Sequence, residues 1–172
     1  MKFKDIEQFT KVGSYQVNMP LVYFAKWVKE SIEEDNLILN PDFQRGHIWN
    51  EKQQTEYIEF LLRGGRSGRI IYFNCPNWSS GARDGDFVCV DGLQRTTAIL
   101  RFINNEIKAF GIYYKDYEDS LPMNIDVLVN INELKTRKEV LKWYIEMNSG
   151  GTPHTESEIN IVKKLLEFEE NK

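Results

Sequence analysis

The segment that most constrains the fold reads Asp91-Gly92-Leu93-Gln94-Arg95-Thr96-Thr97. It follows an apolar run at residues 87–90 and precedes a segment with apolar residues at helical spacing, so we expect a strand to enter a helix through a tight glycine turn. The first turn of a helix carries unpaired backbone N–H groups and the positive end of the helix dipole, which together favour an anion. Arg95 adds a planar cation, and the hydroxyls of Thr96 and Thr97 add donors, so these residues predict a phosphate-binding turn.

Periodicity on either side of this turn predicts alternating helices and strands, which is the pattern of a small α/β or α+β domain. Residues typical of helix ends predict where the helices begin and stop. Capping boxes are expected at Asn50/Gln53, Thr136/Glu139 and Thr155/Glu158. The predicted helices cover residues 20–35, 50–63, 93–104, 136–148 and 155–166, and the predicted strands cover residues 37–39, 70–73, 87–90, 107–110 and 125–131.

The composition is that of one globular domain spanning residues 1–172. Hydrophobic residues make up 41% of the 172 residues and aromatic residues 13%, enough to form a core. No apolar run approaches the length of a membrane span, and the first residues do not resemble a signal peptide. The only two cysteines, Cys75 and Cys89, are expected to be buried thiols rather than a disulfide, which favours a cytoplasmic location.

The formal net charge of −4 argues against a dedicated nucleic-acid-binding protein. Three arginines without a neighbouring acid, Arg63, Arg66 and Arg69, form the best local candidate for contact with DNA or with a triphosphate. The same arginines also suit the C-terminal end of a helix, and the residues leave both interpretations open. Trp78 lies in a polar segment, where an exposed indole is expected to be available to a partner or a base.

Three loops combine turn-forming residues with groups that bind anions or metals: residues 40–45, 91–97 and 148–153. Local sequence alone explains each loop in a simpler way as well. The second loop suits a helix start with an exposed arginine, Arg45 suits a salt bridge, and the third loop suits a glycine-terminated helix followed by a new one.

Taken together, the three loops resemble a known family. Three motifs are similar to those of the N-terminal domains of GmrSD-type modification-dependent restriction endonucleases, within the ParB/sulfiredoxin-like superfamily: Asn40-Pro41-x-Phe43-Gln44-Arg45-x3-Trp49, Val90-Asp91-Gly92-x-Gln94-Arg95 and Met147-Asn148-Ser149-Gly150-Gly151-Thr152-Pro153. The resemblance covers about residues 15–165. It implies a single α+β domain, a small mixed sheet packed with helices.

The resemblance also implies nucleotide chemistry with a nucleoside triphosphate and Mg²⁺. Asn148 is expected near the metal ion, and Asp91, Gln94 and Arg95 are the expected catalytic residues, with Gln94 orienting water and Asp91 acting as base or metal partner. The residues expected to bind the nucleotide are Gln44, Arg45, Gly92, Thr96, Thr97, Ser149 and Gly150.

The chain departs from the family pattern at several positions. Leu93 replaces the usual glutamine of the pentad, and the segment 66–69 replaces a proline-rich entry to the next strand. Met147 stands where ParB proteins carry an acidic metal ligand, and His154 replaces a common leucine. The HNH-type nuclease domain found downstream in the restriction enzymes is expected to be absent, so no nuclease of that kind is predicted.

The leading hypothesis is therefore a nucleoside-triphosphate-binding domain related to DNA restriction or anti-restriction, with hydrolysis as an open step. The alternative is a non-catalytic module from a mobile element that senses modified DNA or inhibits a host defence protein, because the acidic charge favours a protein partner over bare DNA. A third hypothesis is a metal-dependent phosphodiesterase that acts on DNA. No membrane partner is expected.

Overall fold

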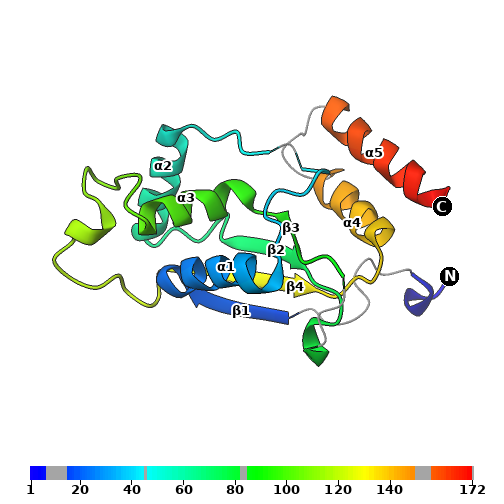
Figure 1. The fold of residues 1–172 in the computed structure, drawn as a ribbon, viewed down its shortest axis with the longest axis horizontal. Coiled ribbons are helices and arrows are strands. Elements are labelled where there is room, and N and C mark those ends of the chain that lie inside the picture. Colours follow the sequence, from blue (N-terminus) through cyan, green and yellow to red (C-terminus); the bar gives the residue numbers. More distant parts are fainter. Residues whose placement is uncertain (7–14, 45, 82–84, 150–155, 172) are drawn as a thin grey trace.

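A computed structural model describes residues 1–6, 15–44, 46–81, 85–149 and 156–171 of the chain, and Figure 1 shows its fold. Five α-helices accompany a four-stranded mixed sheet in these residues, which confirms the predicted α+β class. The elements follow one another as η1 (Phe3–Asp5), β1 (Tyr15–Pro20), α1 (Leu21–Asp35), α2 (Glu51–Leu62), β2 (Ile70–Asn74), η2 (Trp78–Ser80), β3 (Val88–Asp91), α3 (Leu93–Ile103), η3 (Tyr114–Asp116), β4 (Asp126–Asn132), α4 (Arg137–Ser149) and α5 (Glu156–Glu170).

The strand order of the sheet is β1-β4-β2-β3. β4 lies in the interior of the sheet, antiparallel to β1 and parallel to β2, and β2 pairs antiparallel with β3. β3 is therefore an edge strand, and α3 leaves directly from its end (Figure 1). The residues that follow β3 consequently lie at the rim of the sheet, where a ligand has access.

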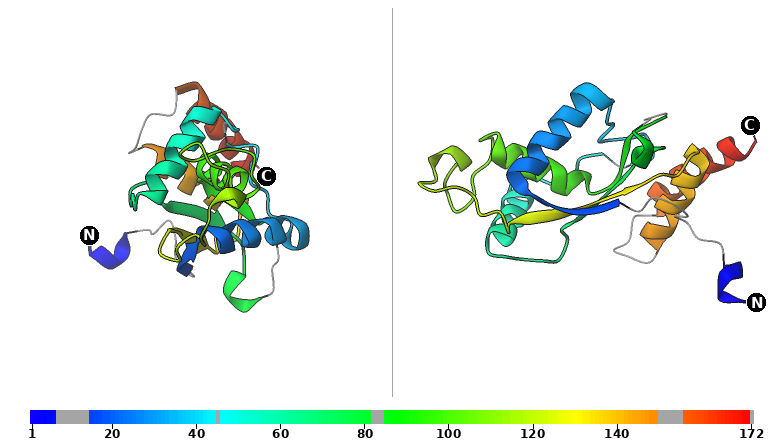
Figure 2. Two further views of the ribbon diagram at one scale, coloured as in Figure 1. Left: turned by 90° about the vertical axis from the view of Figure 1, so that its left-hand side faces the viewer. Right: turned by 90° about the horizontal axis from the view of Figure 1, so that it is seen from below.

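One face of the sheet is covered by α1 and α3, which lie side by side (Figure 2). Val127 and Val129 on β4 point into this layer and are fully buried. Phe24 of α1 and Phe102 of α3 meet them there, at most 1% exposed. Burying aromatic and branched side chains on this scale is the main source of stability for the sheet and its two helices.

A second, smaller core lies at the α4 end of the molecule, where α4 packs on α5 and on β3 (Figure 1). Val88 and Val90 of β3 point into this core and away from the first, as alternation along a strand requires. Asn74 ties the chain leading into α4 to the sheet, since its amide donates to Leu134 O at 3.0 Å and accepts from Leu134 N at 2.8 Å.

The helix predictions are confirmed, including the capping boxes at Asn50/Gln53 and Thr136/Glu139. Thr155 of the third predicted capping box lies outside the described residues. The predicted strand at 37–39 is wrong, because only Ile38 forms a bridge, to Val88. The segment 107–110 likewise contributes a single bridge, at Ala109, so that prediction is wrong as well.

β1 is not among the predicted strands, although Tyr15, Val17 and Met19 alternate with polar residues in the pattern of a half-buried strand. Trp78 also differs from its prediction. Its indole is partly buried against the first core and lies 5.6 Å from the ring of Phe87, so it is not an exposed platform.

The two thiols are buried and free, as predicted. Burial raises the pKa of Cys75 to about 11 and that of Cys89 to about 12, with nearby carboxylates adding to the effect. Among the described residues, no helix is both long enough and apolar enough to cross a lipid bilayer.

Candidate nucleotide-binding cleft

A cleft of about 640 Å³ opens where β3 passes into α3, and all three loops singled out in the sequence contribute to it. Gln44 comes from the first loop, the segment 91–95 from the second, and Asn148 from the end of α4. The loop between α2 and β2 adds Ser67 and Gly68. This volume falls within the range of small-molecule sites, so segments far apart in the sequence form one concave surface of suitable size.

Gly92 makes the turn from β3 into α3 possible. Its φ of +118° lies in the left-handed region that favours glycine, and a Cβ built on it would lie 2.8 Å from Cγ2 of Ile71. Thr96 N donates to Gly92 O at 2.8 Å, which closes the first turn of α3 at the cleft. The predicted glycine turn at a helix start is therefore confirmed, and the N-terminal end of α3 opens onto the cleft.

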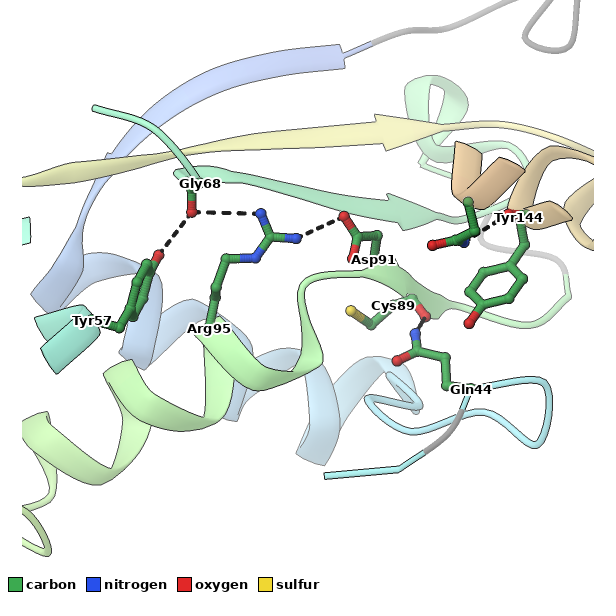
Figure 3. A network of polar contacts seen from close by, with 8 residues as sticks. Gln44, Tyr57, Gly68, Cys89, Asp91, Arg95 and Tyr144 are labelled. Carbon is green, nitrogen blue, oxygen red and sulfur yellow. Dashed lines mark hydrogen bonds and ion pairs between the residues drawn. The ribbon is translucent and has the colours of Figure 1, made fainter. Parts of the chain in front are cut away.

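Arg95 lies at the centre of a polar network in the cleft (Figure 3). Its Nη2 donates to Oδ2 of Asp91 at 2.7 Å, and its Nη1 lies 3.5 Å from Gly68 O. The hydroxyl of Tyr57 donates to the same Gly68 carbonyl at 3.1 Å. Burial raises the pKa of Tyr57 to about 12 against the opposing charges of two arginines, so this hydroxyl keeps its proton.

Gln94 holds the 46–49 loop, which follows the first loop along the chain, against α3. Its Oε1 accepts from the backbone N–H groups of Ile48 and Trp49, both at 3.0 Å, and its Nε2 donates to Gly46 O at 2.8 Å. All three bonds join the side chain to the main chain of one loop. Gln94 thus positions a wall of the cleft, and its expected role in orienting water stays a prediction.

Gln44 and Asn148 present acceptors to the cleft. The Nε2 of Gln44 donates to Cys89 O at 2.5 Å, and the Nδ2 of Asn148 donates to Tyr144 O at 2.7 Å (Figure 3 shows Gln44, Cys89 and Tyr144). Each amide uses its nitrogen on the protein, which leaves its oxygen as the remaining acceptor. The oxygens of the two side chains are suited to a metal ion or to the amino groups of a ligand.

Several predicted binding residues do not line the cleft. Thr96 is fully buried, and its hydroxyl has no partner among the described residues. The hydroxyl of Thr97 donates to Leu93 O at 2.9 Å, one turn earlier in α3. Both residues lie near the start of α3, where a threonine hydroxyl commonly bonds back to its own helix or packs in the core, and their contact with a phosphate stays a prediction. Ser149 is the last residue of α4, and Arg45 and Gly150 lie outside the described residues.

Aromatic residues of the cleft were missed in the sequence analysis. Trp49, Tyr57, Phe60 and Tyr144 line it together with the polar groups. The position of Phe60 outside the apolar stripe of α2 was a readable signal, and in the structure this ring is 40% exposed. Tyr57 and Tyr144 sit at ordinary helical core spacing, so no local pattern distinguishes them from core residues. Trp49 closes the first family motif, but the sequence favours a core role for its ring.

The three arginines proposed for DNA contact have different surroundings. Arg69 forms an ion pair with Asp126 and is only 12% exposed, so its guanidinium is already engaged. The guanidinium of Arg63 lies 5.0 Å from the centre of the Phe110 ring, and Arg66 is exposed. DNA contact through these side chains stays a prediction, with Arg63 and Arg66 as its more accessible members.

The family model for the N-terminal domain of the GmrSD restriction endonuclease matches residues 24–132, which include Gln44 and the whole segment 91–97. Searches of curated proteins and of solved structures found no match.

Proposed function

The chain belongs to the family of GmrSD restriction endonuclease N-terminal domains, a restriction-related family, and from that premise we propose that its cleft binds a nucleoside triphosphate. The observation that carries the proposal is the convergence of Arg95, the start of α3 and two amide side chains on one cleft of about 640 Å³. A guanidinium beside a helix N-terminus is a strong combination for phosphate, because charge and backbone donors act on the same oxygens.

The remaining lining residues suit the rest of a nucleotide. Trp49, Phe60 and Tyr144 offer aromatic surface against which a base or sugar packs. Because these rings share the cleft with Arg95, one ligand with an apolar planar part and an anionic part satisfies both kinds of lining residue. Inorganic phosphate alone has no planar apolar part to pack on these rings.

The side-chain oxygen atoms that line the cleft also fit Mg²⁺ bound through the phosphates of the ligand. Asp91 supplies one carboxylate, and its Oδ1 has no hydrogen bond among the described residues. The amide oxygens of Asn148 and Gln44 are further oxygen ligands without charge. Mg²⁺ in phosphate sites is commonly held by one or two protein carboxylates together with phosphate oxygens and water. When bound, the ion would neutralise charge on the phosphates, and Asp91 would orient it toward the cleft.

Two experiments test the proposal. We expect at least one of the four common nucleoside triphosphates, with Mg²⁺, to raise the melting temperature, and we expect Arg95→Ala to abolish the shift. The control is Lys29→Ala, which removes an exposed cation of α1 that does not line the cleft. No shift with any of the four triphosphates, with or without Mg²⁺, would reject the proposal.

Binding without hydrolysis is the second candidate, and the geometry of Gln94 favours it. Its amide forms three hydrogen bonds with the 46–49 loop, which leaves it little capacity to orient a water molecule. Release of inorganic phosphate from a triphosphate that binds decides between the two candidates. Release that is lost in Asp91→Asn supports hydrolysis, and binding without release supports the non-catalytic module.

A further inference from the structure

A second pocket, with a volume of about 260 Å³, lies at the other end of α3 from the cleft and shares no lining residue with it. Its walls come from the end of α2, the end of α3 and the chain between α3 and β4, which Figure 1 shows at the opposite end of the molecule from α4 and α5. We propose that this pocket binds a trimethylammonium group. The proposal goes beyond nucleotide binding and does not depend on it.

Aromatic rings form the body of the pocket. Phe102 of α3 is 1% exposed, and the rings of Tyr114 and Tyr117 lie 5.6 and 6.3 Å from its ring, at interplanar angles of 68° and 80°. Rings that stand at such steep angles to one another bound a small space on different sides. Phe110 adds a fourth ring to the lining. Grouped rings of this kind attract organic cations, because the face of each ring carries partial negative charge.

The backbone holds Phe110 in a conformation that is unusual for a bulky residue. Its φ of +51° places it in the left-handed region, in a tight turn that a hydrogen-bond pair between Ala109 and Ile112 closes. Glycine, asparagine and aspartate are the usual residues at such a position. Phe110 N donates to Oε1 of Glu59 at 2.8 Å, which fixes the turn to α2. A strained backbone thus keeps an aromatic ring, 44% exposed, beside the pocket.

The charge at the pocket is negative. Asp119 lines it, is exposed, and forms no hydrogen bond or ion pair with any other described residue. Burial, and then the charge of Glu59, raise the pKa of Tyr117, whose hydroxyl donates to Ala109 O at 2.7 Å and stays protonated. The pocket therefore offers an unpaired carboxylate beside neutral rings.

Cations of the protein already contact rings of this part of the chain. The guanidinium of Arg63 lies 5.0 Å from the centre of the Phe110 ring, and the ammonium group of Lys108 lies 4.8 Å from the centre of the Tyr113 ring. Neither cation lines the pocket. Both contacts show that ring faces here are accessible to positive charge, and Arg63 is exposed, so water and salt screen its repulsion of a bound cation.

A trimethylammonium group suits the rings and the carboxylate at once. A neutral apolar group would cover the rings but would place the carboxylate of Asp119 beside a surface that cannot hydrogen-bond to it. A primary ammonium group would pair with Asp119 but would lose strong hydration on entering an aromatic pocket. Methylation removes the N–H donors and spreads the charge over apolar methyl groups, so the cation gains from the rings and loses less on leaving water.

Titration calorimetry at constant ionic strength tests the proposal with three small ligands. Choline carries the trimethylammonium group, its carbon isostere has the same shape without the charge, and ethanolamine has the charge without the methyl groups. We expect choline to bind wild type at least about fivefold more tightly than either of the others. A peptide with one trimethyllysine, compared with choline, shows whether the group fits better on a protein or as a free cation, and tighter binding of either one supports the inference.

Two variants locate the site and separate its two contributions. Asp119→Asn changes an exposed side chain and should weaken choline binding roughly threefold, with the neutral isostere unaffected. Phe110→Leu keeps an apolar side chain and should weaken choline binding by a similar factor. The matched control is Asp116→Asn, an exposed acid of η3 that does not line the pocket. In NMR spectra, choline should shift the amides of residues 110–121 and leave those of residues 91–95 in place.

Several results would overturn the inference. Choline that binds wild type no more tightly than its carbon isostere would show that the pocket is merely apolar, and this comparison does not depend on any variant folding. A preference for choline that survives in Asp119→Asn, or that falls equally in Asp116→Asn, would contradict the role of the Asp119 carboxylate. Amide shifts at residues 91–95 would place the cation in the cleft. None of these results bears on triphosphate binding, which is tested separately.

Discussion

The sheet with α1 and α3 is held together differently from the cleft at its rim. Phe24, Phe73 and Phe102 are almost completely buried in the first region, which owes its stability to apolar area removed from water. The rim is held by single polar bonds between side chains and backbone, above all those of Gln94 and Gln44. Apolar packing tolerates small rearrangements, whereas directional bonds fix positions, so the shape of the cleft depends on a few side chains.

The largest effect is expected from a cavity in the apolar layer. Phe24→Ala removes a fully buried ring and should lower the free energy of unfolding by about 3–5 kcal/mol. Phe3→Ala is the control, since Phe3 is 94% exposed and its loss should change stability by less than about 0.5 kcal/mol. Urea denaturation measures both. Similar losses in the two variants would contradict the assignment of α1 to the main core.

The junction between the two regions should be the next most sensitive position. Gly92→Ala combines a left-handed backbone with a Cβ 2.8 Å from Ile71, and we expect a loss of roughly 3 kcal/mol. Gly111→Ala is the matched control, because Gly111 also has a positive φ, +77°, but its Cβ would meet no atom within 4 Å. That variant should lose about 1 kcal/mol from backbone strain alone. Equal losses of unfolding free energy in urea titrations would show that the side chain of Ile71 moves aside for the added methyl group.

The polar region should respond locally to the loss of its hydrogen bonds. Gln94→Met keeps the length of the side chain, removes three bonds to the 46–49 loop, and should cost about 1–2 kcal/mol. Hydrogen exchange should show the larger change, with faster exchange at the amides of Ile48 and Trp49 than in the core strands. Gln16→Met, on the exposed side of β1, serves as control. Faster exchange throughout β2 and β4 would contradict the separation of the two regions.

Most of the fold could be predicted because apolar spacing and capping residues in the local sequence specify its helices. The spacing of Leu21, Phe24 and Val28 specified α1, and the box of Asn50 with Gln53 specified the start of α2. The wrong strands at 37–39 and 107–110 show the limit of that logic. An apolar run becomes a strand only when a neighbouring strand runs beside it, and each of these segments meets a partner at one residue.

The cleft was only partly predictable. Three turn motifs identified its main walls, and their convergence required the parallel pairing of β2 with β4, which places β3 at the sheet edge beside α4. The partners of Gln94 lie 45 to 48 residues earlier in the chain, so no local pattern reveals that its amide is occupied. Thr96 illustrates a second limit of local sequence, since it is adjacent to Arg95 in the chain but is fully buried, because successive residues of a helix face different directions.

The smallest expected effect is a pH dependence of stability that comes from His47, in the 46–49 loop. Slight burial, and then the charge of Arg101, lower the pKa of His47 below its usual 6.5, so the folded protein holds this proton less tightly than the unfolded chain. The resulting contribution to stability is complete above pH 6.5 and is lost as the pH falls from 6.5 toward the folded pKa. Urea midpoints between pH 8 and 5.5 should therefore decline slightly more for wild type than for His47→Gln, and NMR titration should give a His47 pKa below 6.5. A pKa above 6.5 would mean that an acidic partner outweighs Arg101, and the loop would then gain stability on acidification.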